Sequence, residues 1–196
     1  MSKFLVIAEK PSVAQSYAKN LSAYKREDGY LEGESCIVSW CLGHLAEYAQ
    51  PEEYDPKYEK WQFDDLPILP EVWKLKVSKD KKKQFDVLKG LMNRSDVEYL
   101  VNGCDAGREG ELIFQRVYNL AGCRKPVKRL WISSMEDAAI QKGFQTMKSE
   151  EEYKNLCMAA VCRAQADWLI GMNGTRAYTC LLYTSPSPRA STSSRM

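Results

Sequence analysis

A short apolar run that ends in a carboxylate is the feature that most constrains the fold of this chain. The run is Lys3-Phe-Leu-Val-Ile-Ala-Glu9, and Pro11-Ser12 open a helical stretch to about Leu21 directly after it. An uninterrupted apolar run of this length is typical of a strand buried on both faces, as in a parallel sheet. Proline is tolerated in the first turn of a helix. The amino-terminal segment therefore predicts a buried strand followed at once by a helix.

The alternation of strand and helix continues along the chain. The expected elements are a hairpin over 30–42 around Gly33, strands over 73–77, 97–101 and 127–132, and helices over 79–92, 109–120 and 135–147. Strands that alternate with helices favour an α/β fold with a parallel, doubly wound sheet flanked by helices. We expect this fold to occupy residues 1–148 as one domain.

The remaining regions follow different patterns. Residues 55–70 carry three prolines among aromatic side chains and predict an ordered but irregular segment. A long helical stretch over 151–170 indicates that 149–180 begins a second, helical domain. The last sixteen residues, 181–196, hold five Ser, two Thr and two Pro without apolar periodicity. Because such a segment buries too little surface to offset its ordering entropy, we expect it to be disordered.

Composition and cysteine usage exclude several classes of protein. With 44% apolar and 28% charged residues, the chain has the balance of a soluble globular protein. Its uncharged apolar runs, such as Phe4–Ala8, are far shorter than the ~20 residues of a spanning helix, and the signal-peptide pattern is missing. Seven cysteines without a CxxC pair and a single histidine, His44, argue against structural zinc. We therefore expect a cytoplasmic protein with buried free thiols and no membrane association.

The net charge of +2 conceals a strong local separation of charge. Residues 27–71 hold twelve acidic and two basic side chains, 73–94 hold eight basic and two acidic, and the chain from Arg124 on holds eleven basic and six acidic. Such separation can steer a polyanion to one face of a protein. For Lys79–Lys83 alone, a solvated helix face is an equally good interpretation.

Two acidic clusters follow predicted strands, where α/β folds place their active sites. Glu9-Lys10 ends the first strand, and Asp105-Ala-Gly-Arg-Glu-Gly-Glu111 follows the strand through Val101. If these strands are neighbours, Glu9 and Asp105 project into one crevice, and a hard divalent cation would neutralise their repulsion. Mg²⁺ uses one or two protein carboxylates and keeps water and phosphate oxygens as its other ligands. With Lys10 and Arg108 available to hold a phosphate, the pattern indicates phosphoryl-transfer chemistry.

A purely structural interpretation of these acids is also open. Taken alone, Glu9 is better explained as a helix cap. Glu109 and Glu111 have the position of acids that complement a helix N-terminus. What this interpretation leaves unexplained is the concentration of glycines, carboxylates and arginine in one loop.

The motifs resemble the Toprim domain of type IA DNA topoisomerases, and most closely that of bacterial topoisomerase III. The resemblance covers residue 1 to about Thr179, and its segments are Glu9-Lys-Pro-Ser-Val-Ala14, Asp105-Ala-Gly-Arg-Glu-Gly-Glu-Leu-Ile113, Arg129-Leu-Trp-Ile-Ser-Ser134 and Arg163-Ala-Gln-Ala-Asp-Trp-Leu-Ile-Gly-Met-Asn-Gly-Thr-Arg176. Primases and several nucleases share an isolated DxDxE motif. The Arg-Glu-Gly-Glu extension and the Asp-Trp-Leu-Ile-Gly segment are much more specific.

The resemblance implies roles for the acidic cluster. Glu9 and Asp105 would bind Mg²⁺, and Glu9 would also take part in proton transfer to the departing 3′ oxygen. Lys10 would contact the scissile phosphate, and Glu109 would support the metal or its positioning. Gly107 stands where many relatives carry a second Asp, which disfavours a two-metal site. The family joins DNA to a tyrosine of a later domain, so we expect this chain to be an amino-terminal part that is inactive alone.

The resemblance also implies contacts with single-stranded DNA and no nucleotide cofactor. The implied DNA-binding residues are Trp61, Arg163, Trp168 and Arg176. Indole faces stack on bases without sequence preference, and arginine forks onto phosphate. Alternatives stay open, because Trp168 has the spacing of a core residue and Arg163 can form a helix ion pair with Asp167. Another Toprim enzyme, such as a primase or metal-dependent nuclease, and a non-catalytic nucleic-acid-binding module are the competing functions.

Overall fold

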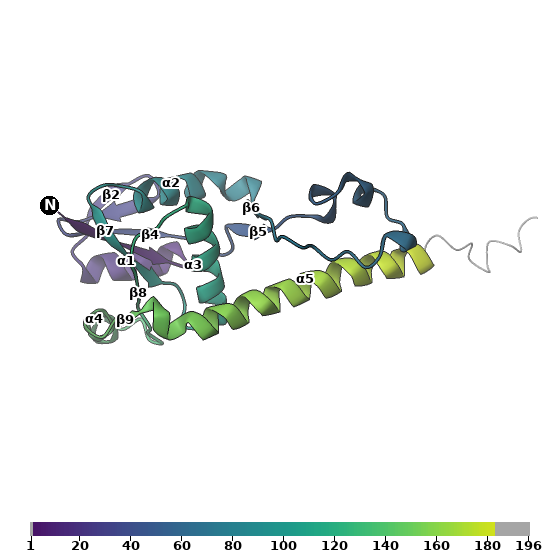
Figure 1. The fold of residues 1–196 in the computed structure, drawn as a ribbon. Coiled ribbons are helices and arrows are strands. Elements are labelled where there is room, and N and C mark those ends of the chain that lie inside the picture. The colour runs from purple at the N-terminus through teal and green to yellow at the C-terminus, as the bar shows by residue number, and fades with distance from the viewer. Residues whose placement is uncertain (1, 183–196) are drawn as a thin grey trace, which may run out of the picture. The chain divides into compact units, whose positions relative to one another are not determined.

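A computed structural model describes residues 2–182 of the chain. Its contacts divide the chain into two compact units (Figure 1). The first, here called the α/β unit, comprises Met1–Glu47 and Leu75–Val161, and the second unit comprises Tyr48–Lys74 and the chain from Cys162 on. The domain boundary at 148/149 that the sequence suggests stays a prediction. Each unit is described by itself below.

The α/β unit is built on a seven-stranded sheet with the order β2-β3-β4-β1-β7-β8-β9. Its strands are β1 (Lys3–Ala8), β2 (Lys25–Glu27), β3 (Tyr30–Glu32), β4 (Cys36–Trp40), β7 (Val97–Gly103), β8 (Val127–Arg129) and β9 (Lys148–Ser149). The four central strands, β4, β1, β7 and β8, are parallel. The edge strands β2, β3 and β9 pair antiparallel. The predicted parallel sheet and the hairpin around Gly33 are confirmed, whereas β8 is shorter than the predicted strand over 127–132.

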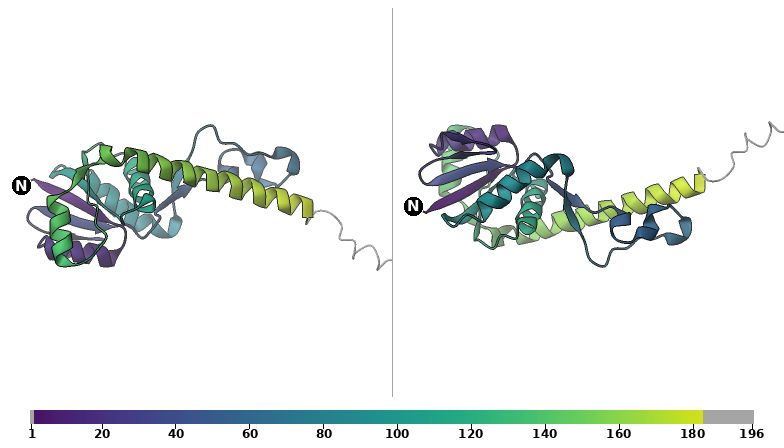
Figure 2. Two further views of the ribbon diagram at one scale, coloured as in Figure 1. Left: turned by 90° about the horizontal axis from the view of Figure 1, so that it is seen from below. Right: turned by 90° about the horizontal axis from the view of Figure 1, so that it is seen from above.

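Helices cover both faces of this sheet (Figures 1 and 2). The helices are α1 (Pro11–Asn20), α2 (Lys82–Met92), α3 (Arg108–Ala121) and α4 (Asp137–Gln145). In β1, Leu5 and Ile7 pack with α2 and α3, while Val6 and Ala8 pack with α1 and α4. Successive side chains of a strand point to opposite faces, and here both faces are covered. This is why the run is apolar at consecutive positions.

The second unit combines short 3₁₀ helices with part of one long helix. Its elements are η1 (Pro51–Glu53), η2 (Pro56–Glu59), η3 (Phe63–Asp65) and, from Cys162 on, α5 (Lys154–Leu182). The 3₁₀ turns agree with the irregular segment predicted for 55–70. Asn173 of α5 fixes that segment, because its amide accepts from the Ile68 nitrogen at 2.6 Å and donates to the Ile68 oxygen at 3.1 Å.

Further strands and 3₁₀ helices lie outside the seven-stranded sheet. They are β5 (Ala46–Tyr48) and β6 (Leu75–Val77), which form a two-stranded sheet, and the 3₁₀ helices η4 (Lys79–Lys81) and η5 (Glu150–Tyr153). The predicted disordered tail is wrong for Leu181 and Leu182, which end α5, and the rest of it lies outside the described residues. All seven cysteines are free, as expected, but Cys162 is exposed and Cys157 is only half-buried. Between residues 2 and 182, none of the helices is long and apolar enough to span a membrane.

Close packing of α4 on the sheet gives a stability prediction. A Cβ added to Gly143 would lie 2.4 Å from Cγ2 of Ile132 and 2.9 Å from Cδ1 of Leu130. Because overpacking forces buried side chains to shift, Gly143→Ala should lower the free energy of unfolding by about 1–3 kcal/mol. Urea denaturation followed by circular dichroism measures this change.

Gly90→Ala is the matched control. Gly90 lies in α2, and a Cβ there would meet nothing within 4 Å. Alanine has the higher helix propensity, so this change should raise the free energy of unfolding by about 0.5–1 kcal/mol. Equal effects of the two substitutions would contradict the packing described for α4.

Candidate metal and phosphate site

The two predicted carboxylates leave the sheet at the same edge. β1 and β7 are parallel neighbours with Ala8 opposite Gly103, so Glu9 and Asp105 both follow the carboxyl ends of adjacent strands. The Asp105 backbone amide donates to Glu9 Oε2 at 3.3 Å. This confirms the strand adjacency that the sequence analysis assumed and brings the two acids into contact.

Lys10 lies between the two carboxylates. Its Nζ atom is 3.3 Å from Asp105 Oδ2 and 3.8 Å from Glu9 Oε1. The negative charge of Asp105, and to a lesser extent that of Glu9, raises the pKa of Lys10 above its ordinary value. The ammonium therefore stays charged at neutral pH. Because the Lys10 side chain is 56% exposed, this charge is open to a phosphate from solvent.

Glu9 does not act as a helix cap. The cap residue of α1 is Lys10, whose side chain makes no capping hydrogen bond. The Glu9 carboxylate instead accepts from the Asp105 amide and is almost fully buried. A largely buried acid that faces a second acid requires a nearby positive charge, so its position is better explained by a site than by helix capping.

Each of the three acids that follow β7 has a different side-chain partner. Asp105 contacts Lys10, the exposed Glu109 pairs with His44 Nε2, and Glu111 pairs with Arg129 Nε at 2.5 Å. Glu109 and Glu111 lie in the first turn of α3, which agrees with the helix-terminus interpretation of their position. Their side chains nonetheless have specific partners outside that helix.

Arg129 is the largest side chain that is fully buried in the described chain. Its guanidinium donates to the carbonyl oxygens of Asn102 at 3.0 Å, Cys104 at 2.7 Å and Asp105 at 2.8 Å. Burial raises the pKa of the Glu111 carboxyl, and the Arg129 charge opposes this shift. The pair thus joins β8, α3 and the loop that carries Asp105.

Sequence reasoning missed two of these pairs. It treated His44 as a packed or hydrogen-bonded residue, which its bond to Glu109 confirms, but it did not place this bond at the site. Arg129 was noted only as the start of a family segment. Its position in a short strand flanked by apolar residues is a usable signal, because a charged side chain in a buried strand requires a counter-charge.

The donor set suits one hard cation. Within residues 2–182, no group of three or more His, Cys, Asp or Glu side chains is arranged to hold a metal. Two carboxylates converge at the edge of the sheet, however, and both contact a positive charge, that of Lys10. Mg²⁺ commonly takes one or two protein carboxylates and fills its other positions with water and phosphate oxygens. Two carboxylates beside one ammonium form a donor set of the kind that hard cations and phosphate use together.

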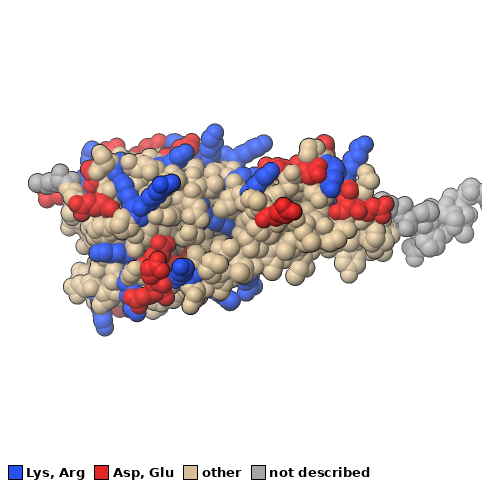
Figure 3. Space-filling view, in the orientation of Figure 1, with Lys and Arg blue, Asp and Glu red and all other residues tan. Residues whose placement is uncertain are grey.

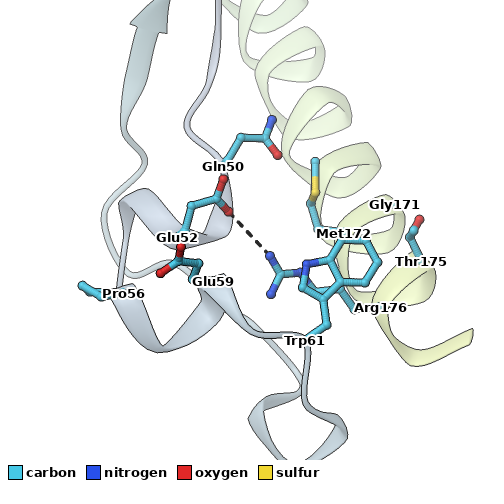
Figure 4. A pocket seen from close by; sticks show the side chains of 9 residues that line it. All are labelled: Gln50, Glu52, Pro56, Glu59, Trp61, Gly171, Met172, Thr175 and Arg176. Carbon is cyan, nitrogen blue, oxygen red and sulfur yellow. Dashed lines mark ion pairs between the residues drawn. The ribbon is translucent and has the colours of Figure 1, made fainter. Parts of the chain in front are cut away.

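The predicted DNA-binding residues all belong to the second unit, and the structure brings two of them together. Trp61 and Arg176 line a pocket of about 820 Å³ with Glu52 and Glu59 (Figure 4). The Arg176 guanidinium lies 5.0 Å from the centre of the Trp61 ring and 3.6 Å from Glu52 Oε2. The Arg176 guanidinium also donates to the backbone carbonyl oxygen of Tyr58 at 2.6 Å, and Arg176 is buried.

The other two predicted DNA-binding residues lie elsewhere in that unit. Trp168 is buried, donates to the Ala49 oxygen at 3.1 Å and packs edge-on against the rings of Tyr54 and Trp73. Trp168 therefore occupies a core position, which is the alternative that its helical spacing left open. Arg163 is exposed, and its Nε is 3.7 Å from Asp167 Oδ2, one helical turn away. Of these four residues, Trp61 and Arg163 are therefore the ones exposed to solvent, at 46% for Trp61 and 65% for the Arg163 side chain.

The acidic and basic stretches of the sequence do not form separate charged regions on the face of the molecule drawn in Figure 3. Basic and acidic side chains are interspersed there, and neither sign covers a large uninterrupted area. Several lysines have acidic partners, as in the pairs of Lys83 with Asp28 and Lys19 with Asp137. Local pairing thus disperses the basic and acidic stretches of the sequence.

Comparisons with known proteins show what this chain is similar to. The family model for the Toprim domain matches residues 4–135. DNA topoisomerase 3 of Bacillus subtilis is 51% identical over 179 residues, which are 91% of this chain and 25% of that protein. DNA topoisomerase 3 of Bacillus licheniformis is 49% identical, also over 179 residues and with the same coverage of both chains. Full-length topoisomerase I from Thermotoga maritima is a solved structure with a TM-score of 0.49 and 18% identity, covering 74% of this chain and 21% of that one.

The chain spans about a quarter of the length of the curated relatives that it matches. The segment matched by the family model contains β1, the acidic loop and β8, and with them every side chain of the carboxylate site. By this match over most of its length, the chain belongs to the Toprim domain family.

Proposed function

We propose that this chain is the amino-terminal part of a type IA DNA topoisomerase of the topoisomerase 3 kind, an enzyme that breaks one DNA strand, passes DNA through the break and rejoins it. The observation that carries the proposal is the convergence of Glu9, Lys10 and Asp105 at the carboxyl ends of β1 and β7. The 51% identity to DNA topoisomerase 3 of Bacillus subtilis supports this enzyme over a primase or nuclease.

In this proposal Glu9 and Asp105 hold one Mg²⁺. The ion would supply positive charge to the phosphate oxygens as negative charge develops on them. Two protein ligands leave most of the coordination sphere to water and phosphate, as magnesium requires. Gly107, at the position of the second Asp of many relatives, adds no further carboxylate to the site.

The remaining polar groups have separate roles in the proposal. Lys10 holds the scissile phosphate, because its charged ammonium is exposed beside both carboxylates. Glu9, whose carboxylate is nearly buried, takes part in proton transfer to the departing 3′ oxygen. Glu109 supports this arrangement through its bond to His44, and the exposed Arg108 beside it adds a second charge for phosphate.

Single-stranded DNA is the proposed substrate, without a nucleotide cofactor, in the cytoplasm. Trp61 is 46% exposed and offers a ring face for a base, while Arg163 offers a charge for a phosphate. The buried Arg176 is proposed to contribute through the pocket that it lines, where it lies against the Trp61 ring, and Trp168 through the core that it fills. Their own polar groups already have protein partners.

The metal proposal predicts a stabilisation that depends on two carboxylates. Mg²⁺ at about 100 times its Kd should raise the free energy of unfolding by about 2.7 kcal/mol, because the ion binds only the folded state. Asp105→Asn and Glu9→Gln should each abolish this gain. Urea denaturation with and without MgCl₂ measures it.

Asp86→Asn is the control for this experiment. Asp86 is an exposed carboxylate of α2 and lies outside the site. This variant should keep the full response to Mg²⁺. A full response in Asp105→Asn would place the bound ion elsewhere and contradict the proposal.

The DNA proposal predicts two different responses to salt. Arg163→Ala should reduce the slope of log affinity against log salt concentration by about 0.7, the contribution of one phosphate contact to a single strand. Trp61→Ala should weaken binding by about 1–3 kcal/mol and leave the slope unchanged, because stacking is not screened by salt. Fluorescence anisotropy with a labelled oligothymidylate measures both quantities.

Two exposed residues of the α/β unit, Arg26 and Tyr24, provide matched controls. Arg26→Ala and Tyr24→Ala should change neither the affinity nor its salt slope. If the two controls and the two test variants behave alike, the proposed DNA contacts in the second unit are wrong.

A further inference from the structure

We propose that Arg129 is the positioning residue of the carboxylate site: held by Glu111, its guanidinium fixes the backbone on both sides of Asp105 and so keeps the Asp105 carboxylate beside Glu9 and Lys10. This inference rests on the proposed function insofar as Asp105 is the metal ligand. It concerns a residue that contacts neither the metal nor the phosphate.

The contacts of Arg129 concentrate on the turn from β7 into the acidic loop. One terminal nitrogen donates to the oxygens of Asn102 and Cys104 at 3.0 and 2.7 Å, and the other donates to the Asp105 oxygen at 2.8 Å. Three carbonyl groups of one turn that point to the same buried cation leave the chain little freedom. The direction in which Asp105 leaves the strand is therefore set by the side chain of Arg129.

Glu111 provides the counter-charge for the buried guanidinium of Arg129. Its side chain is 3% exposed and that of Arg129 is 1% exposed, so neither charge is compensated by water. Glu111 Oε1 accepts from Arg129, and Oε2 accepts from the Asn102 side chain at 3.4 Å. Both carboxylate oxygens thus have protein donors, and Glu111 acts on the site through Arg129 rather than as a metal ligand.

Gly110 allows the same carbonyl to be approached from a second direction. A Cβ at this position would lie 2.1 Å from the Asp105 oxygen, the atom that accepts from Arg129. The first turn of α3 therefore packs directly on the backbone of Asp105. With Arg129 on one side and Gly110 on the other, the Asp105 peptide is enclosed.

A lysine cannot reproduce the arrangement that Arg129 makes. The planar guanidinium directs its donors to several acceptors at once, whereas an ammonium is a single compact centre. Arg129→Lys keeps the charge that Glu111 requires but loses most of the bonds to the loop. This substitution therefore separates the positioning role from the charge itself.

The first test measures the freedom of the loop without any metal. The Asp105 amide, which donates to Glu9, should exchange its hydrogen about tenfold faster in Arg129→Lys, a factor that corresponds to the net contribution of one hydrogen bond. Amides of α2 should exchange at the wild-type rate, which shows that the fold is intact. An unchanged rate at Asp105 would overturn the proposal.

Arg94→Lys is the matched control. Arg94 also forms ion pairs, with Asp96 at 2.7 Å and Glu32 at 3.0 Å, but it precedes the opposite end of β7. A merely structural loss of an arginine network should therefore leave the Asp105 amide unchanged. Faster exchange at Asp105 in Arg94→Lys as well would also overturn the proposal.

The second test measures the consequence for the metal. Isothermal titration with MgCl₂ should give an affinity for Arg129→Lys about 10–100-fold below that of the wild-type chain, as for other residues that orient a metal ligand. Arg94→Lys should keep the wild-type affinity. If the wild-type chain itself does not bind Mg²⁺, the proposed function fails, and the exchange of the Asp105 amide still decides the role of Arg129.

Glu111→Gln covers the case in which Arg129→Lys does not fold. The glutamine keeps an acceptor of the same shape but removes the charge that holds the guanidinium. The Asp105 amide should again exchange faster than in the wild-type chain. Wild-type exchange in a folded Glu111→Gln chain would then overturn the proposal.

Discussion

The two-sided burial of β1 is the constraint on which the rest of the α/β unit depends. The strand is hydrogen-bonded to β4 on one side and β7 on the other, and helices cover both of its faces. After Lys3, every side chain of this strand is apolar. The first position where charge can reach solvent is its carboxyl end, where Glu9 and Lys10 follow Ala8. The neighbouring parallel strand ends at the same edge and delivers Asp105 there.

Several acids lie at this edge of the sheet, and the contacts that they make differ in burial. Lys10 is exposed beside Asp105, Glu109 pairs with His44 at the surface, and Arg129 is fully enclosed with Glu111. An exposed pair contributes little to stability, so the Lys10 ammonium can exchange a carboxylate for a phosphate at small cost. A buried pair is costly to separate and therefore holds the loop in place.

The second unit shows the same division between exposed and enclosed cations. Arg176 lies in the pocket of Figure 4, but its guanidinium is buried against Trp61 and already contacts Glu52 and the Tyr58 oxygen. Its charge is largely satisfied within the protein. Arg163 is not enclosed in this way, because 65% of its side chain is exposed to solvent. Exposure, more than residue type, separates a side chain that shapes a surface from one that contacts a ligand.

The sequence by itself determined the alternation of strands and helices, because apolar periodicity is local. It placed Glu9 and Asp105 together only if their strands are neighbours, and the tertiary structure supplied that adjacency. Only the tertiary structure decided the partners of Glu109 and Glu111, since His44 and Arg129 come from distant segments and no local pattern joins them. It also decided the place of Trp168, because helical spacing is the same for a core residue and a stacking platform. Which face of a helix is covered depends on packing between segments, and a linear pattern does not contain that information.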